Sequence, residues 1–249
     1  MRTLYDTIGI NYSDRRRADP RIAAAIHAHL DGAETVLNVG AGAGSYEPAH
    51  LKVTAVEPSA EMIRQRPPGE AVVVQAFAED LPFDDNTFDA ALAILTVHHW
   101  SDVRQGLKEM RRVTRGKVII LTFDPQVSNF WLLDYMPSLA TLDRQLMPDM
   151  AVYQSVFGPV QTIAVPIPHD CIDGILCAHW RRPSAYLDPN VRRSMSSFSK
   201  IGDVTEPLRQ LQDDIASGEW ARRYSRFLDM AACDFGYRLV VAGPRTQAA

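Results

Sequence analysis

Short apolar runs that alternate with helical segments between positions 35 and 123 constrain the fold of this chain more than any other feature. The runs are rich in Val, Ile, Leu and Ala and nearly unbroken, which is typical of parallel strands buried on both faces. They are Thr35–Gly40, Val53–Glu57, Ala71–Gln75, Ala90–Leu95 and Lys117–Phe123. Because parallel strands need crossover connections, the pattern predicts an α/β fold with a doubly wound sheet.

Helix signals accompany these runs. Asp19-Pro20 supplies an N-cap and a proline at the first helical position, and Gly32 ends the predicted helix. Its apolar stripe is formed by Ile22, Ile26 and Leu30. A second stripe lies in the segment 101–115, between the last two strands, and consists of Val103, Leu107, Met110 and Val113.

The alternation stops after Asp124. We expect a helix over Trp131–Leu146 and strands over Val160–Ile167 and Tyr237–Ala242, with three helical stripes between these two strands. We therefore predict one domain over 1–249, with an N-terminal cap and first helix over 1–33 and a core over 34–168. The domain is completed by a helical insertion over 169–235 and by a last strand with its tail over 236–249. The insertion either covers the end of the sheet as a substrate lid or only adds to the core.

Composition excludes several functional classes. A hydrophobic fraction of 46% excludes disorder, and a net charge of −4 disfavours nucleic acid and membrane surfaces as partners. The longest apolar stretches are too short to span a bilayer, and the N-terminus lacks the apolar region of a signal peptide. The three cysteines include no Cys-x-x-Cys pair. We expect a cytoplasmic protein with reduced thiols and no metal, because no set of ligands has zinc-like spacing.

A glycine-rich turn follows the first predicted strand. Gly40, Gly42 and Gly44 stand at alternate positions, with a candidate helix beyond them. Glycine lets the chain turn sharply and lets a ligand approach backbone N–H groups, and a following helix would add partial positive charge. Glu57 ends the next strand, where a carboxylate can accept hydrogen bonds from both hydroxyls of a ribose. Together these features predict a nucleoside-type cofactor.

The spacing of the glycines distinguishes between cofactors. The dinucleotide fingerprint Gly-x-Gly-x-x-Gly/Ala requires Gly or Ala at position 45, where this chain has Ser45. The third glycine comes one residue early, and no Gly-Lys-Ser/Thr follows as a nucleotide-triphosphate loop requires. A nicotinamide-dependent dehydrogenase is therefore disfavoured.

Three successive segments, 36–47, 53–62 and 78–89, resemble motifs of the class I S-adenosylmethionine-dependent methyltransferases. The small-molecule branch of this family is the most similar, through AEDLPF at 78–83 and NTFD at 86–89. The resemblance covers about half of the chain, residues 1–125, including ILTVHHW at 94–100. It implies a Rossmann-like, mostly parallel seven-stranded sheet with an antiparallel last strand. It also implies S-adenosyl-L-methionine as cofactor and S-adenosyl-L-homocysteine as product.

The resemblance implies a role for each cofactor residue. Those on the methionine side are Gly40, Gly42 and Gly44 against the chain, Leu95 and Thr96 beside the sulfonium, and Tyr12 and Arg16 over the carboxylate. Those on the nucleoside side are Glu57 at the ribose, Pro58 and Met62 near the adenine, and Ala78 and Glu79 at the adenine edge.

Two positions depart from the family pattern. Asn38 stands where the family often has an acid, and it keeps hydrogen-bonding capacity. Phe77 stands where the family commonly has an aspartate that binds the adenine amino group. Phenylalanine cannot make that bond, so either Glu79 takes it or Phe77 stacks on the ring.

His98 and His99 are the candidate catalytic residues. They follow the fourth predicted strand, at the sheet edge where ligands bind in open α/β folds, and histidine titrates near neutrality. One of them would act as a general base only if the acceptor loses a proton during attack. Alternatively, one is a buried hydrogen-bonding residue and the other faces water. Candidate substrate-binding residues are Asp124, His169, Trp180 and Arg181. Alternatively, Asp124 is a helix N-cap, Trp180 a core residue and Arg181 part of a solvated face.

The sequence thus predicts a methyltransferase that acts on a small organic acceptor by in-line displacement. Two alternatives stay open. One is a non-catalytic protein that binds S-adenosylmethionine or S-adenosylhomocysteine, and the other is a methyltransferase acting on a protein or peptide.

Overall fold

The computed structural model describes residues 16–127 and 129–244. Its main feature is a seven-stranded sheet of order β3-β2-β1-β4-β5-β9-β6. The strands are β1 (Thr35–Val39), β2 (Lys52–Val56), β3 (Val72–Val74), β4 (Phe88–Ile94), β5 (Thr114–Phe123), β6 (Val160–Ala164) and β9 (Tyr237–Ala242). The first five pair in parallel, and β9 runs antiparallel to both of its neighbours. The predicted mostly parallel sheet with an antiparallel last strand is confirmed.

Helices cover both faces of this sheet. On one face, α2 (Pro20–His27) buries Ile22 and Ile26, and the Asp19 side chain caps it as predicted. On the other face lie α4 (Val103–Val113) and α7 (Met150–Phe157), which bury Leu107 and Tyr153. The short helix α3 (Ala60–Arg64) follows β2, and the 3-10 turn η1 (Val97–His99) follows β4.

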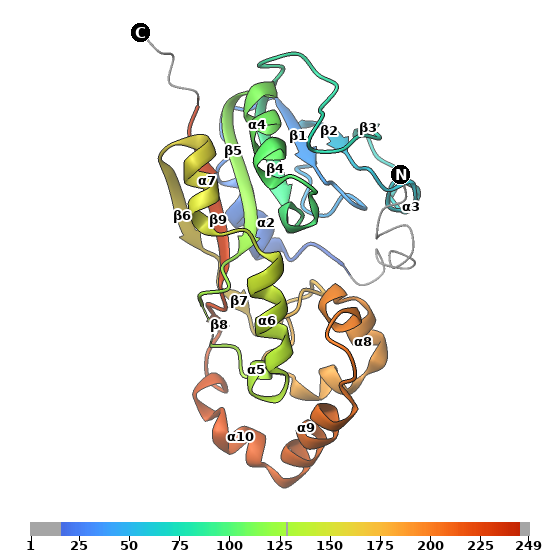
Figure 1. Ribbon diagram of the computed structural model, residues 1–249, viewed down its shortest axis with the longest axis vertical. Helices are drawn as coiled ribbons and strands as arrows, with labels where there is room; N and C mark the ends of the chain where they lie inside the picture. The colour runs from blue at the N-terminus through green and yellow to red at the C-terminus, as the bar shows by residue number, and fades with distance from the viewer. Residues whose placement is uncertain (1–15, 128, 245–249) are drawn as a thin grey trace.

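The remaining helices gather at the carboxyl end of the sheet (Figure 1). This follows from the pairing of Phe123, the last residue of β5, with Tyr237, the first of β9. The helices are α5 (Leu132–Tyr135), α6 (Pro137–Leu146), α8 (Pro189–Arg193), α9 (Thr205–Ser217) and α10 (Glu219–Arg223). The 3-10 turns η2 (Pro183–Leu187), η3 (Ser196–Ser199) and η4 (Ser225–Phe227) lie among them, with a two-stranded sheet of β7 (Ile167–Pro168) and β8 (Ala232–Cys233).

These helices and turns, with the segments that connect them, form the helical region. The helical region and the sheet share one hydrophobic core. Trp131, Trp180 and Trp220 are buried in the same cluster as Ile119 and Leu239 of the sheet. The Trp131 ring lies edge-on to Trp220, with ring centroids 5.2 Å apart. This contact joins α5 to α10, and the shared cluster packs both of them against the sheet.

Three expectations about secondary structure were wrong. The strand expected over 160–167 ends at Ala164, because Pro166 cannot donate to a ladder, and Ile167 pairs with β8 instead. The helix expected over 131–146 breaks at Met136, since a proline disfavours helical geometry in the residue before it. No helix begins between Gly40 and Leu51, a stretch in which every residue is described.

Candidate active site

A cavity of about 440 Å³ lies at the carboxyl ends of β1, β2 and β4. Its walls come from the glycine turn, the end of β2, the segment before β4 and the segment 94–101 after it. Arg16 and Lys200 add two cations from distant parts of the chain. An open α/β sheet binds ligands at this edge, where the strand order reverses.

The glycine turn permits a close approach between two strands. Gly40 has a positive φ of +69°, and a Cβ there would overlap the Thr96 hydroxyl at the end of β4. Gly40 and Ala41 donate their N–H groups to Val56, and Gly42 donates to Glu57. The expectation that these N–H groups serve a ligand, assisted by a following helix, is therefore not met. The turn instead leaves space for a ligand beside Gly40 and Gly42.

Glu57 is held in place by backbone donors. Its side chain is buried, with Oε2 accepting from Gly42 N at 2.8 Å and Oε1 from Ser59 N at 2.9 Å. An ionised carboxylate has about four acceptor sites. A fixed carboxylate at the cavity wall can therefore accept hydroxyl donors from a ligand.

The opposite end of the cavity has a large exposed aromatic side chain. Phe77 is 44% exposed and lines the cavity beside Ala78. Glu79 Oε1 accepts three hydrogen bonds, from Ser101 N at 2.7 Å, Ser101 Oγ at 2.8 Å and Asp102 N at 3.1 Å. Glu79 therefore orders the segment that leads into α4.

Asn38 leaves a buried acceptor without a partner. Its Nδ2 donates to Glu47 Oε1 at 3.0 Å, whereas its Oδ1 is buried and has no hydrogen bond to any residue that the structure describes. A buried carbonyl oxygen without a partner costs free energy. Asn38 belongs to the wall of the cavity, so this cost arises beside the ligand site.

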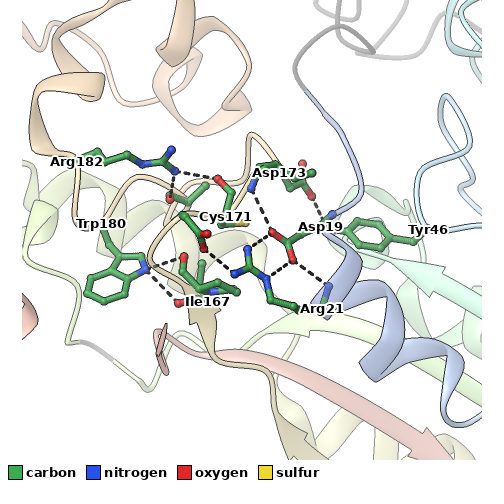
Figure 2. Close-up of polar contacts among 12 residues, drawn as sticks. Asp19, Arg21, Tyr46, Ile167, Cys171, Asp173, Trp180 and Arg182 are labelled. Carbon is green, nitrogen blue, oxygen red and sulfur yellow. Dashed lines mark hydrogen bonds and ion pairs between the residues drawn. The ribbon is translucent and has the colours of Figure 1, made fainter. Parts of the chain in front are cut away.

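Buried ion pairs join the cavity to the helical region. Arg16 Nε donates to Asp173 Oδ1 at 2.7 Å, and the Tyr46 hydroxyl donates to Asp173 Oδ2 at 2.8 Å. Figure 2 shows Tyr46, Asp173 and the neighbouring pair of Asp19 and Arg21. Burial alone would raise the pKa of Asp19, but hydrogen bonds from Arg21 and from backbone donors lower it to about 2. The segment before α2 is thereby tied to the start of the predicted insertion.

Sequence and structure comparisons agree on a family. A family model described as a methyltransferase domain matches residues 37–122. A solved structure from Anabaena variabilis, described as a methyltransferase from an antibiotic biosynthesis pathway, is 33% identical to this chain. The two superpose with a TM-score of 0.82 over 92% of this chain and 98% of the other. This chain belongs to the class I S-adenosylmethionine-dependent methyltransferases.

The methyltransferase also resembles curated proteins over part of its length. The ubiquinone/menaquinone biosynthesis C-methyltransferase UbiE of a Geobacter species is 30% identical over 157 aligned positions, and the match covers 53% of this chain and 64% of that protein. The 2-methyl-6-phytyl-1,4-hydroquinone methyltransferase 2 of Oryza sativa is 30% identical over 107 residues, 39% and 31% of the two chains. The matches thus span less than two thirds of these curated relatives.

The cofactor of the methyltransferase is S-adenosyl-L-methionine, which leaves as S-adenosyl-L-homocysteine. The cavity suits a nucleoside, since Gly40 and Gly42 leave space beside Glu57 and their own N–H groups are engaged within the protein. The cations Arg16 and Lys200 in the wall suit the carboxylate of an amino acid.

The cavity brings together most of the predicted cofactor residues. Those that line it are Arg16, Gly40, Gly42, Glu57, Pro58, Met62, Ala78, Glu79, Leu95 and Thr96. Gly44 lies outside the lining, and a side chain there would meet the Arg66 guanidinium at 3.2 Å. Tyr12 lies outside the described residues.

His98 and His99 lie in the wall of the cavity, three and four positions after a strained residue. Leu95 has a φ of +52°, which a branched side chain adopts only under constraint from its surroundings. The two imidazole rings are 3.9 Å apart between centroids. Burial lowers the pKa of His98 well below 6.5, and His99, Lys200 and Arg16 lower it further. Burial, Lys200 and Arg16 together lower the pKa of His99 to about 4, so both rings are neutral at pH 7.

A second, smaller cavity of about 80 Å³ adjoins the first. Arg16, Leu95, His98 and His99 belong to the walls of both cavities. The rest of its wall comes from the ends of β5, α6 and β9 and from the segments 174–176 and 194–197 of the helical region. The histidines therefore stand between two adjoining spaces.

The predicted substrate residues lie away from both cavities. Asp124 accepts from Gln126 N at 3.0 Å and caps a turn. Trp180 is fully buried and donates to Ile167 O at 3.0 Å, which is the core role left open for it. Arg181 donates to Met230 O at 3.1 Å on the surface, and His169 donates its backbone N–H to Ala231 O.

Sequence reasoning missed several wall residues. Lys200 and the segment 194–197 reach the cavities only through the arrangement of the helical region, and no local motif marks them. Tyr46 also belongs to the wall of the larger cavity, and it lies at the end of the first family motif, which could have identified it. None of the helices in the described part of the chain is long and apolar enough to cross a membrane.

Proposed function

We propose that this enzyme transfers the methyl group of S-adenosyl-L-methionine to a small organic acceptor by in-line displacement. The observation that carries the proposal is the pair of adjoining cavities with Leu95, His98 and His99 in their common wall. The larger suits the cofactor, and the smaller adjoins it with a volume of about 80 Å³. Relatives named for quinone and hydroquinone methylation support this class of acceptor.

We infer a holding role for each wall residue of the larger cavity. Glu57 would accept from the ribose hydroxyls, and Asn38 Oδ1 from the methionine ammonium. Arg16 and Lys200 would face the methionine carboxylate. Phe77 would stack on the adenine, because the Oε1 atom of Glu79 already accepts three hydrogen bonds. When bound, the sulfonium supplies a methyl group that is already activated.

His98 and His99 are the proposed catalytic residues. A neutral imidazole can accept a proton, and the low pKa of both rings keeps them neutral over the physiological range. One ring would accept a hydrogen bond from the acceptor. It would take the proton of the attacking atom only if ligand binding raised the pKa of the ring, because a general base works best with a pKa near the operating pH. The other would orient the acceptor between the cavities.

The helical region would act as a lid within a single domain. Lys200 and the segment 194–197 contribute to the cavity walls, and Asp173 pairs with Arg16. The shared core indicates that this region also stabilises the sheet. Some residues of the insertion would then act as a lid, and others would belong to the core.

The test is release of S-adenosyl-L-homocysteine by the purified protein, measured with a panel of small phenols, hydroquinones and aromatic amines and with mixed peptides. We expect turnover with members of the small-molecule panel. Turnover with peptides alone would favour the protein-acceptor alternative. Tight cofactor binding without turnover on any compound would favour the non-catalytic alternative.

A further inference from the structure

Asp143 is a buried carboxylate without a partner. It lies on α6 with 6% of its surface exposed, and its side chain makes no hydrogen bond or ion pair within the described ranges 16–127 and 129–244. Asp19 and Asp173 are equally buried, yet each is paired with an arginine. Because buried charges are almost always paired, Asp143 is the exception that needs a reason.

Asp143 faces the smaller of the two cavities. Most of the surrounding wall is apolar, formed by Phe123, Met147, Ile175, Leu176 and Met195. Ser196 and Ser197 also belong to that wall, and two of its other polar groups are already engaged. Ser194 donates to Val191 O at 2.7 Å, and the Tyr237 hydroxyl interacts with the backbone of Cys177. Arg16, His98 and His99 line the side shared with the larger cavity.

We infer that Asp143 binds the methyl acceptor, and that the acceptor is a mostly apolar small molecule with a hydroxyl or amino group that donates to this carboxylate. The inference rests on the proposed function and specifies its substrate class. The acceptor would have two ends, a donor group on Asp143 and an attacking atom near His98 and His99. A carbonyl or ether oxygen at the first end offers no hydrogen and would leave the carboxylate unsatisfied.

The ionisation of Asp143 agrees with this role. Burial raises its pKa to about 6, and Arg144, an exposed neighbour on the same helix, offsets only part of that rise. The carboxylate is therefore mostly ionised at pH 7.5. An ionised acceptor group makes stronger hydrogen bonds than a neutral one, which favours hydroxyl and amino donors in this space.

The same arrangement predicts a stability cost. A buried carboxylate without a partner destabilises the fold, so removing it at pH 7.5 should raise the melting temperature. A purely structural role predicts the opposite result. Asp143→Asn keeps the shape, and Asp143→Leu removes the polar atoms as well. Asp213→Asn is the matched control, because Asp213 is 67% exposed on α9 and far from both cavities.

The probes are hydroquinone and 4-methoxyphenol, with 4-aminophenol and tyramine as amino donors. Hydroquinone keeps a donor at both ends, whereas 4-methoxyphenol has lost one. We expect the wild-type enzyme to favour hydroquinone about ten- to hundredfold in kcat/KM, the range for a hydrogen bond to a charged group. Asp143→Asn and Asp143→Leu should bring the ratio of the two kcat/KM values toward one and should raise the melting temperature. Asp213→Asn should change neither the ratio nor the melting temperature.

The possible outcomes separate this inference from the proposed function. If the wild-type enzyme methylates these compounds but the Asp143 variants keep the preference, the inference is wrong and the function stands. Equal turnover of both probes by the wild-type enzyme overturns the inference in the same way. If only peptides are methylated, the proposed function fails and the inference fails with it. A rise in KM with the amino probes alone would identify an amine as the donor.

Discussion

Arg16 Nε and Asp173 Oδ1 lie 2.7 Å apart, although 157 positions separate the two residues in the chain. Asp173 is 1% exposed and also accepts from the Tyr46 hydroxyl, which itself belongs to the wall of the larger cavity. One carboxylate thus joins the segment before α2, the loop after the glycine turn and the start of the helical region. Through Arg16, this junction reaches both cavities.

Replacing Asp173 should therefore affect stability and ligand binding together. Asp173→Ala leaves Arg16 without its buried partner, and we expect a loss of up to about 3 kcal/mol in the free energy of unfolding. S-adenosyl-L-homocysteine should also bind more weakly, because Arg16 is no longer held in the wall. Urea denaturation and calorimetric titration measure the two effects.

The control for this change is Asp170→Ala. Asp170 pairs with Arg21 at 2.6 Å but is 57% exposed, and exposed pairs contribute little. We expect near-wild-type stability and binding. Equal losses in both variants would show that the Arg16–Asp173 pair has no special role.

Gly40 offers a second test, because it combines a positive φ with a close neighbour. Gly40→Ala should cost more than backbone strain alone, since its Cβ would overlap the Thr96 hydroxyl. Gly218→Ala is the matched control, with a φ of +79° and open space around it. We expect the control to lose about 1–2 kcal/mol and Gly40→Ala to lose more, with cofactor affinity reduced only in Gly40→Ala. Equal losses in urea denaturation would contradict the close approach.

The part of the site that the sequence could predict depends on local patterns. The glycine turn and Glu57 each follow directly after a buried strand, so their positions at the sheet edge follow from strand order. The strand β9 has the bounds expected from its apolar run. Pro137 and Pro166 were also visible in the sequence. Pro137 explains why the predicted helix over 131–146 was too long, and Pro166 explains the same for the predicted strand over 160–167.

The rest depends on contacts between distant segments. Lys200 and Asp143 lie in the helical region, and their approach to the cavities is set by how that region packs on the sheet. Periodicity predicts that α6 is amphipathic but not that its buried face carries an aspartate toward a cavity. Trp180 had two interpretations in the sequence, and its complete burial decides for the core.

Glu57 provides a third prediction. Glu57→Gln replaces one acceptor oxygen by an amide group, which cannot accept from both ribose hydroxyls and from Gly42 N together. We expect S-adenosyl-L-homocysteine binding to weaken by about 1–3 kcal/mol, with a smaller change in the unfolding free energy. Titration calorimetry gives the affinity, and unchanged affinity would remove the ribose assignment.

The pH dependence of stability provides the last prediction. The pKa of His99 is lowered to about 4 in the folded protein by burial, Lys200 and Arg16, from an ordinary value of 6.5. The folded state therefore favours the neutral ring, and its contribution to stability is present above pH 6.5 and lost as the pH falls toward 4. His99→Gln removes this titration, so its unfolding free energy should fall less steeply than that of the wild type between pH 6.5 and 4.

Asp143 changes the stability in the opposite direction. Its raised pKa of about 6 favours the protonated carboxyl in the folded state, so its contribution stabilises the fold as the pH falls through 6. Urea unfolding of the wild type, His99→Gln and Asp143→Asn across this range separates the two contributions, and parallel curves for all three proteins would contradict both.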